Sequence, residues 1–133
     1  MGAMQQFKMN KLDWCITIYY TVDESQKSDI LKGLEEMHCN RETIDSISRN
    51  LTKARDDTGF TYSNYSNKCS ILVIHKASSI GEFINTFEHE KNHLEMHICE
   101  ALDINPYSEE AAHISGDLSQ AIIEEALCSI VEL

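Results

Sequence analysis

The chain has 133 residues, of which 42% are hydrophobic and 25% charged, and its formal net charge is −11. This length and composition suit a single globular domain over residues 1–133. The acidic surface repels phosphates and anionic lipid head groups, which argues against a nucleic-acid or a membrane partner. Five scattered cysteines without a C-x-x-C pair, and no apolar stretch long enough for a signal or a membrane span, predict a reducing, cytoplasmic location. The oligomeric state is left open.

The first ten residues contain no convincing pattern, and we expect them to be flexible and partly a cloning remnant. Residues 13–22 alternate in polarity and predict a strand with one face built from Trp14, Ile16, Ile18, Tyr20 and Val22. Asp23 and Gln26 have the spacing of a capping box, which predicts a helix to about residue 37. Asn40 is a candidate cap for a further helix through Ala54.

Residues 60–62 and 69–75 predict a hairpin, and the second strand is apolar on both faces, so we expect it inside the sheet. Residues 80–102 predict one long helix, because apolar residues recur there at helical spacing with few breakers. Pro106 ends that helix region, and Ser108 is a good N-cap for a last helix. The fold class is therefore α+β: a small, mostly antiparallel sheet of about three strands packed with four helices.

The third of these helices carries the sequence His89-Glu90-Lys91-Asn92-His93. On an α-helix, positions i and i+4 differ by only about 40° of rotation, so His89 and His93 can share one metal ion. Glu90 lies beside the pair, where a carboxylate can act as general base on a water. The three histidines of this helix lie off its apolar stripe, so the competing interpretation is a solvated polar face.

A third metal ligand is needed, and the last helix offers one. Its apolar residues form one stripe, and Glu109, His113 and Gly116 lie on the other side. Two antiparallel helices burying their stripes in one core would bring Glu109 over His89 and His93, with Gly116 allowing close approach. Acidic residues in a first turn also simply favour the helix dipole. The remaining candidates for the third ligand are Glu110, His113 and His97.

The motif His89-Glu90-x-x-His93 followed by Ser108-Glu109-Glu110-Ala111-Ala112-His113 resembles the gluzincin-type zinc metallopeptidases. It is more similar to the small HExxH proteins encoded by phages and mobile elements, and to the metallopeptidase-like domain of phage immunity regulators. The resemblance implies a minimal zincin-like domain that binds Zn²⁺. Its Glu-x-x-Ala pattern places the third ligand on Glu109.

We therefore expect a zinc metallopeptidase that acts on a peptide or protein substrate, with His89, His93 and Glu109 as ligands and Glu90 as general base. His113 is expected to support a ligand or contact the substrate. The strand at residues 69–75 could hold an extended substrate if it lies at a sheet edge. The alternative function is a non-enzymatic, zinc-containing module that acts through a protein partner.

Overall fold

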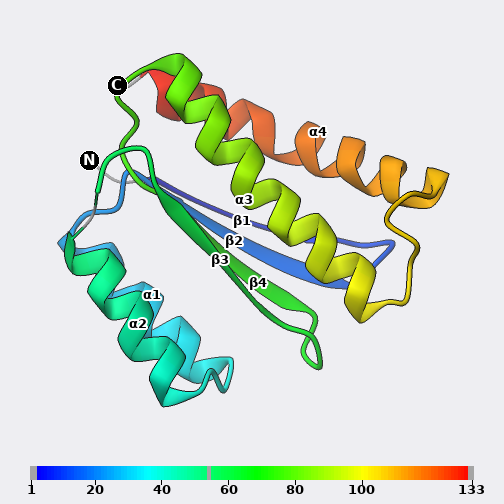
Figure 1. Ribbon diagram of the computed structural model, residues 1–133, viewed down its shortest axis with the longest axis horizontal. Coiled ribbons are helices and arrows are strands. Elements are labelled where there is room, and N and C mark those ends of the chain that lie inside the picture. Colours follow the sequence, from blue (N-terminus) through cyan, green and yellow to red (C-terminus); the bar gives the residue numbers. More distant parts are fainter. Residues whose placement is uncertain (1–2, 54, 132–133) are drawn as a thin grey trace.

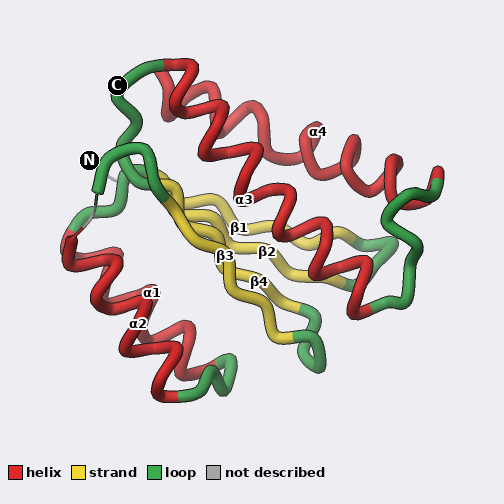
Figure 2. Tube along the Cα trace, in the orientation of Figure 1, coloured by secondary structure: helices red, strands yellow, loops and turns green. Residues whose placement is uncertain are grey.

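The fold, a computed structural model that describes residues 3–53 and 55–131, has three layers. A four-stranded sheet lies in the middle, α1 and α2 cover one face, and α3 and α4 cover the other (Figures 1 and 2). The elements follow each other as β1 (Ala3–Met9), β2 (Trp14–Tyr20), α1 (Glu24–Glu36), α2 (Arg41–Lys53), β3 (Gly59–Asn64), β4 (Cys69–Ile74), α3 (Ile80–Ala101) and α4 (Glu109–Val131). The predicted α+β class and the predicted helices are confirmed.

The sheet has the strand order β1-β2-β4-β3 and is mixed. β1 and β2 are antiparallel, β3 and β4 form the predicted hairpin, and β2 runs parallel to β4. Parallel neighbours need a long crossover connection, and α1, α2 and β3 provide it. The prediction of about three mostly antiparallel strands was therefore one strand short and missed the parallel pair.

The missing strand is β1, which lies in the segment that we expected to be flexible. It pairs with β2 over its whole length, from Ala3 opposite Tyr20 to Met9 opposite Trp14. Gln5 also donates a hydrogen bond from Nε2 to the carbonyl oxygen of Ala121 in α4, at 2.8 Å. The first two residues, which belong to the same prediction, lie outside the described part of the chain, as does Ala54 at the predicted end of α2.

The interior position predicted for residues 69–75 is confirmed, because β4 has a partner on each side. The condition for substrate binding along this strand, a position at the sheet edge, is therefore not met. The edge on the HExxH side of the sheet belongs to β3, which contacts α3 along its length. Strand order is a tertiary property that the apolar run in β4 does not specify.

Each face of the sheet has its own hydrophobic core. Beneath α3 and α4, the predicted face of β2 meets Phe83, Phe87, Leu94 and Ile98 of α3 and Ile114, Leu118 and Ile122 of α4. Beneath α1 and α2, the core contains Ile30, Leu34, Ile44, Ile47 and Leu51, together with Ile71 and Val73 of β4. β4 contributes to both cores, which explains its continuous apolar run.

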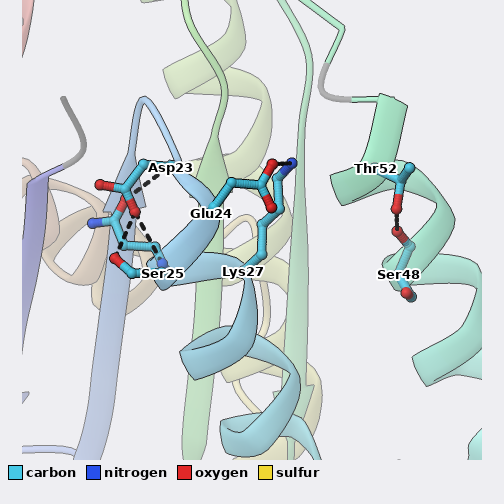
Figure 3. Close-up of polar contacts among 7 residues, drawn as sticks. Asp23, Glu24, Ser25, Lys27, Ser48 and Thr52 are labelled. Atoms are coloured by element: carbon cyan, nitrogen blue, oxygen red, sulfur yellow. Dashed lines mark hydrogen bonds and ion pairs between the residues drawn. The ribbon is translucent and has the colours of Figure 1, made fainter.

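Local capping signals begin the helices where the sequence predicts them. Asp23 accepts a hydrogen bond from the Gln26 backbone at 3.0 Å, and the Gln26 side chain accepts one from the Asp23 backbone at 3.1 Å. Figure 3 shows this cap beside the Glu24–Lys27 ion pair and, in α2, the bond from Thr52 to the Ser48 backbone. Asn40 caps α2 by accepting from the Thr43 backbone at 2.8 Å.

The two last helices run antiparallel, as predicted, and their apolar stripes share one core (Figure 1). The Ser108 hydroxyl accepts from the Ala111 backbone at 3.1 Å, which confirms this N-cap. The role given to Gly116 is wrong: a Cβ atom added there would meet nothing within 4 Å, so no close approach depends on it. In the described part of the chain, no helix is long and apolar enough to cross a membrane.

Candidate metal centre

The two histidines of the HExxH motif lie one helical turn apart on α3, and their Nε2 atoms are 3.2 Å apart. Ser79 caps this helix and accepts from the Glu82 backbone at 3.0 Å. Two Zn–N bonds of about 2.0–2.1 Å that meet at a tetrahedral angle separate their nitrogens by about 3.3 Å. His89 and His93 therefore fit two corners of a zinc coordination tetrahedron.

Glu90 is buried next to this pair, with only 4% of its surface exposed. Its Oε1 atom accepts a hydrogen bond from the Thr61 hydroxyl of β3 at 2.8 Å. Its Oε2 atom lies 4.0 Å from Nε2 of His89. The bond from β3 thus holds one carboxylate oxygen, and the other oxygen lies on the side of His89.

An open cleft of about 270 Å³ lies between α3 and the start of β3. His89 and Glu90 line it together with Asp57, Thr58, Gly59, Asn85 and Thr86. The cleft therefore joins one predicted metal ligand and the predicted base to the free edge of the sheet. A substrate entering it would meet both groups.

Gly59 sets the distance between β3 and Glu90. A Cβ atom at this position would lie 2.3 Å from the backbone oxygen of Val73 and 3.2 Å from Cγ of Glu90. Both contacts are closer than real Cβ atoms tolerate without a shift, and the first is to backbone, which cannot rotate away. The glycine is therefore required for the close packing of the hairpin under the site.

Gly59→Ala is expected to lower the free energy of unfolding by about 1–3 kcal/mol, because an overpacked position forces the backbone to move. Urea unfolding followed by circular dichroism measures this change. Gly116→Ala is the matched control: with open space around it, alanine should stabilise α4 by about 0.5–1 kcal/mol. Equal stabilities for Gly59→Ala and wild type would show that the strand shifts freely.

The predicted third ligand, Glu109, lies apart from this centre. Its side chain is 86% exposed, and its Oε1 atom lies 3.6 Å from Nε2 of His113 on the same helix, whose side chain is 75% exposed. Across the described residues, no three His, Cys, Asp or Glu side chains form a group that could hold a metal ion. The structure thus places His89 and His93 together beside Glu90 but supplies no third ligand in the part of the chain that it describes, because Glu109 and His113 do not join them.

The packing of α4 explains this separation. Ser115 of α4 donates to Oε1 of Glu95 at 2.9 Å, and the buried Lys91 reaches both Glu95, at 2.9 Å, and Ser115, at 3.2 Å. These contacts seat α4 on the flank of α3 that carries Lys91 and Glu95. The histidine row instead borders β3, where Nδ1 of His97 lies 2.7 Å from the Ser63 hydroxyl.

His75, a further histidine at the end of β4, lies on the opposite face of the sheet. It is buried, and its Nε2 atom lies 2.9 Å from Oδ1 of Asn50 in α2. Burial lowers the pKa of this imidazole, and the charge of Lys27 lowers it further, while Asp56 acts in the other direction. His75 therefore belongs to the core under α1 and α2 and not to the candidate site.

This lowered pKa predicts a loss of stability in mild acid. The unfolded chain binds a proton at His75 below about pH 6.5, where the folded chain still resists it, so the contribution is complete above pH 6.5 and is lost as pH falls through the folded pKa. Urea unfolding at pH 7.5 and pH 5.5 should show a smaller decrease in His75→Gln than in wild type. A decrease of the same size in both proteins would contradict this role.

Sequence reasoning missed three residues that shape the site: Gly59, Thr61 and Ser63. They alternate along β3 with Phe60 and Tyr62, which pack into the core under α1 and α2. A period of two over residues 59–63 would have placed Gly59, Thr61 and Ser63 on one face, but the predicted strand ended at residue 62 and left Ser63 in the turn. This periodicity does not tell which helix packs against that face of the strand.

The known proteins offer no guide to these residues. Comparison of the chain with protein-family models, with curated proteins and with solved structures finds no match. The assignment of a function therefore rests on the geometry of His89, Glu90 and His93 and on the surroundings of that triplet.

Proposed function

We propose that this chain is a zinc-dependent hydrolase that cleaves a peptide bond, with His89 and His93 as zinc ligands and Glu90 as general base. The observation that supports this most is the 3.2 Å separation of the two Nε2 atoms beside a buried carboxylate. A solvated polar face accounts for two exposed histidines, but it does not account for burying Glu90 between them and the sheet. Burying a carboxylate without a function is costly.

The chemistry divides between the metal and the chain. Zinc supplies Lewis acidity, which polarises a carbonyl and lowers the pKa of a water in an open coordination position toward about 7. Glu90 takes the proton of the attacking water and delivers it to the leaving amine. Thr61 holds the carboxylate by its Oε1 atom at 2.8 Å, so that the same side chain stays in place for both proton transfers.

A peptide is the preferred substrate class because β3 is an edge strand that borders the cleft. An extended chain can add to such an edge through main-chain hydrogen bonds, which would lead its scissile bond past Gly59 toward Glu90. By the resemblance to small HExxH proteins, we further propose a cytoplasmic accessory protein of a phage or mobile element.

The first test is metal content. Protein purified without an affinity tag and dialysed against a chelator should take up about one zinc ion per chain, because one HExxH pair forms one site. Isothermal titration and elemental analysis measure the stoichiometry, and zinc uptake should be blocked in the double variant His89→Ala/His93→Ala. Absence of uptake by the wild-type protein would refute the proposal.

The second candidate function is a zinc-containing binding module without catalysis. The observation in its favour is that the described side chains provide two imidazoles and no third grouped ligand, so a partner protein could complete the coordination. The two functions differ in their dependence on Glu90, which a binding module would not need.

A further inference from the structure

A hydrogen-bonded chain of four side chains runs beneath α3 and ends on His97. Nε1 of Trp14 donates to the Ser70 hydroxyl at 2.9 Å. The hydroxyl oxygens of Ser70 and Ser63 are 2.6 Å apart, and the Ser63 oxygen is 2.7 Å from Nδ1 of His97. The chain thus crosses from β2 through β4 and β3 to the helix that carries the candidate metal centre.

The proton positions in this chain follow from its first member. An indole nitrogen can only donate, so the Ser70 oxygen accepts from Trp14. Ser70 is 2% exposed, and Ser63 is its other hydrogen-bond partner among the described residues, so the Ser70 hydroxyl donates to Ser63. The reverse order between the two serines would leave the buried Ser70 proton without an acceptor. If each hydroxyl accepts once and donates once, the Ser63 proton is the one shared with Nδ1 of His97.

A chain in which each hydroxyl accepts once and donates once predicts the tautomer of His97. If Nδ1 accepts, the neutral ring carries its proton on Nε2. A histidine that binds a metal through Nε2 instead needs a proton on Nδ1 and an acceptor for it. The hydrogen-bonded chain from Trp14 instead presents a donor to Nδ1, where a metal-binding histidine needs an acceptor.

We propose that His97 is a hydrogen-bond donor to the substrate and not the third metal ligand. Its ring lies 6.4 Å from that of His93, between centroids, on the flank of α3 that borders β3. Because Nδ1 contacts Ser63, Nε2 lies at the opposite end of the ring, which also borders Tyr65 at 5.8 Å between centroids. From there we infer that Nε2–H donates to a carbonyl oxygen of a peptide bound along β3. The tautomer assignment depends only on the hydrogen bonds of the chain, whereas donation from His97 to a substrate rests on the proposed function.

The tautomer can be measured on the whole protein without metal. Long-range ¹H–¹⁵N correlation spectra of histidine-labelled protein at pH 8 should show His97 with a protonated Nε2 and an unprotonated Nδ1. Ser63→Ala should increase the Nδ1–H form, whereas Ser66→Ala, which removes an exposed hydroxyl from the same hairpin, should leave the spectrum unchanged. A predominant Nδ1–H form in the wild-type protein would overturn the assignment.

Adding zinc separates a donor from a ligand. The His97 signals should persist at saturation while those of His89 and His93 change, and His97→Ala should alter zinc affinity by less than about twofold, whereas loss of a ligand or its partner costs tenfold or more. A zinc-bound His97 Nε2 would overturn the proposal. Failure of the protein to bind zinc would refute the proposed function and leave the measured tautomer standing.

The donor role has its own probe. Acetohydroxamate, whose oxygens mimic a hydrated peptide bond at zinc, should bind zinc-loaded His97→Ala about tenfold more weakly than wild type, which corresponds to one lost hydrogen bond. His97→Gln, which retains an N–H donor, should recover part of this affinity. Equal affinities for wild type and His97→Ala would show that His97 does not donate to a ligand of the metal.

Discussion

Glu90→Gln is expected to abolish hydrolysis while zinc stays bound. The glutamine oxygen can still accept the bond from Thr61 that Glu90 accepts at 2.8 Å, so the local packing should survive. An amide cannot take a proton from water, and loss of a general base lowers rates by about 100- to 10,000-fold. Release of peptides from casein, followed by mass spectrometry, and zinc analysis of the same preparation provide the two measurements.

Glu88→Gln is the matched control for this substitution. Glu88 lies on the same helix, but its side chain is 56% exposed and pairs with Lys91 at 3.8 Å. The Glu88→Gln substitution removes the same charge from α3 without changing a residue that lines the cleft. The hydrolytic activity of this variant should therefore remain close to that of the wild-type protein. Loss of zinc from Glu90→Gln would make Glu90 a ligand, and full activity in this variant would show that Glu90 is not the general base. Absence of hydrolysis by the zinc-loaded wild-type protein would instead favour the binding module.

His93→Ala should lose zinc almost completely. Changes to the partners of metal ligands already reduce affinity by about 10–100-fold, so loss of a ligand itself should exceed about 100-fold. Competition with a fluorescent chelator measures the affinity. The control is His38→Asn, which removes an exposed imidazole from the far end of α1, where asparagine tolerates the positive φ of 58°.

The same competition experiment decides the third ligand. Because Glu109 and His113 are exposed and pair with each other on α4, Glu109→Ala and His113→Ala should each change zinc affinity by less than about threefold, far below the cost of losing a ligand. A loss for Glu109→Ala as large as that for His93→Ala would mean that the first turn of α4 reaches the metal in solution. It would then establish the ligand that the sequence predicts.

Local patterns were sufficient for most elements. The capping box at Asp23 and the caps at Asn40 and Ser108 marked three helix starts correctly. Alternation in β2 placed Trp14, Ile16 and Ile18 on one buried face. Each of these signals lies within a few residues of the structure that it specifies, so it does not depend on the rest of the fold.

β1 is a strand that local sequence patterns do not predict. Its sequence, AMQQFKM, has few of the β-branched and aromatic residues that mark a strand, and it becomes one because β2 offers a free edge in register. The position of Glu109 has a similar cause. Helical periodicity places it opposite the buried stripe of α4, but the contacts of Ser115 with Lys91 and Glu95 decide on which flank of α3 that helix lies.

The sequence by itself determined the pair of imidazoles, because His89 and His93 lie one turn apart on any α-helix and their convergence needs no other element. Only the tertiary structure decided what surrounds them. It buried Glu90 against Thr61, joined His97 to Trp14 through two serines, and made β3 an edge strand of the sheet. These contacts join residues that are far apart in the chain, so they follow from strand order and helix packing rather than from any local pattern.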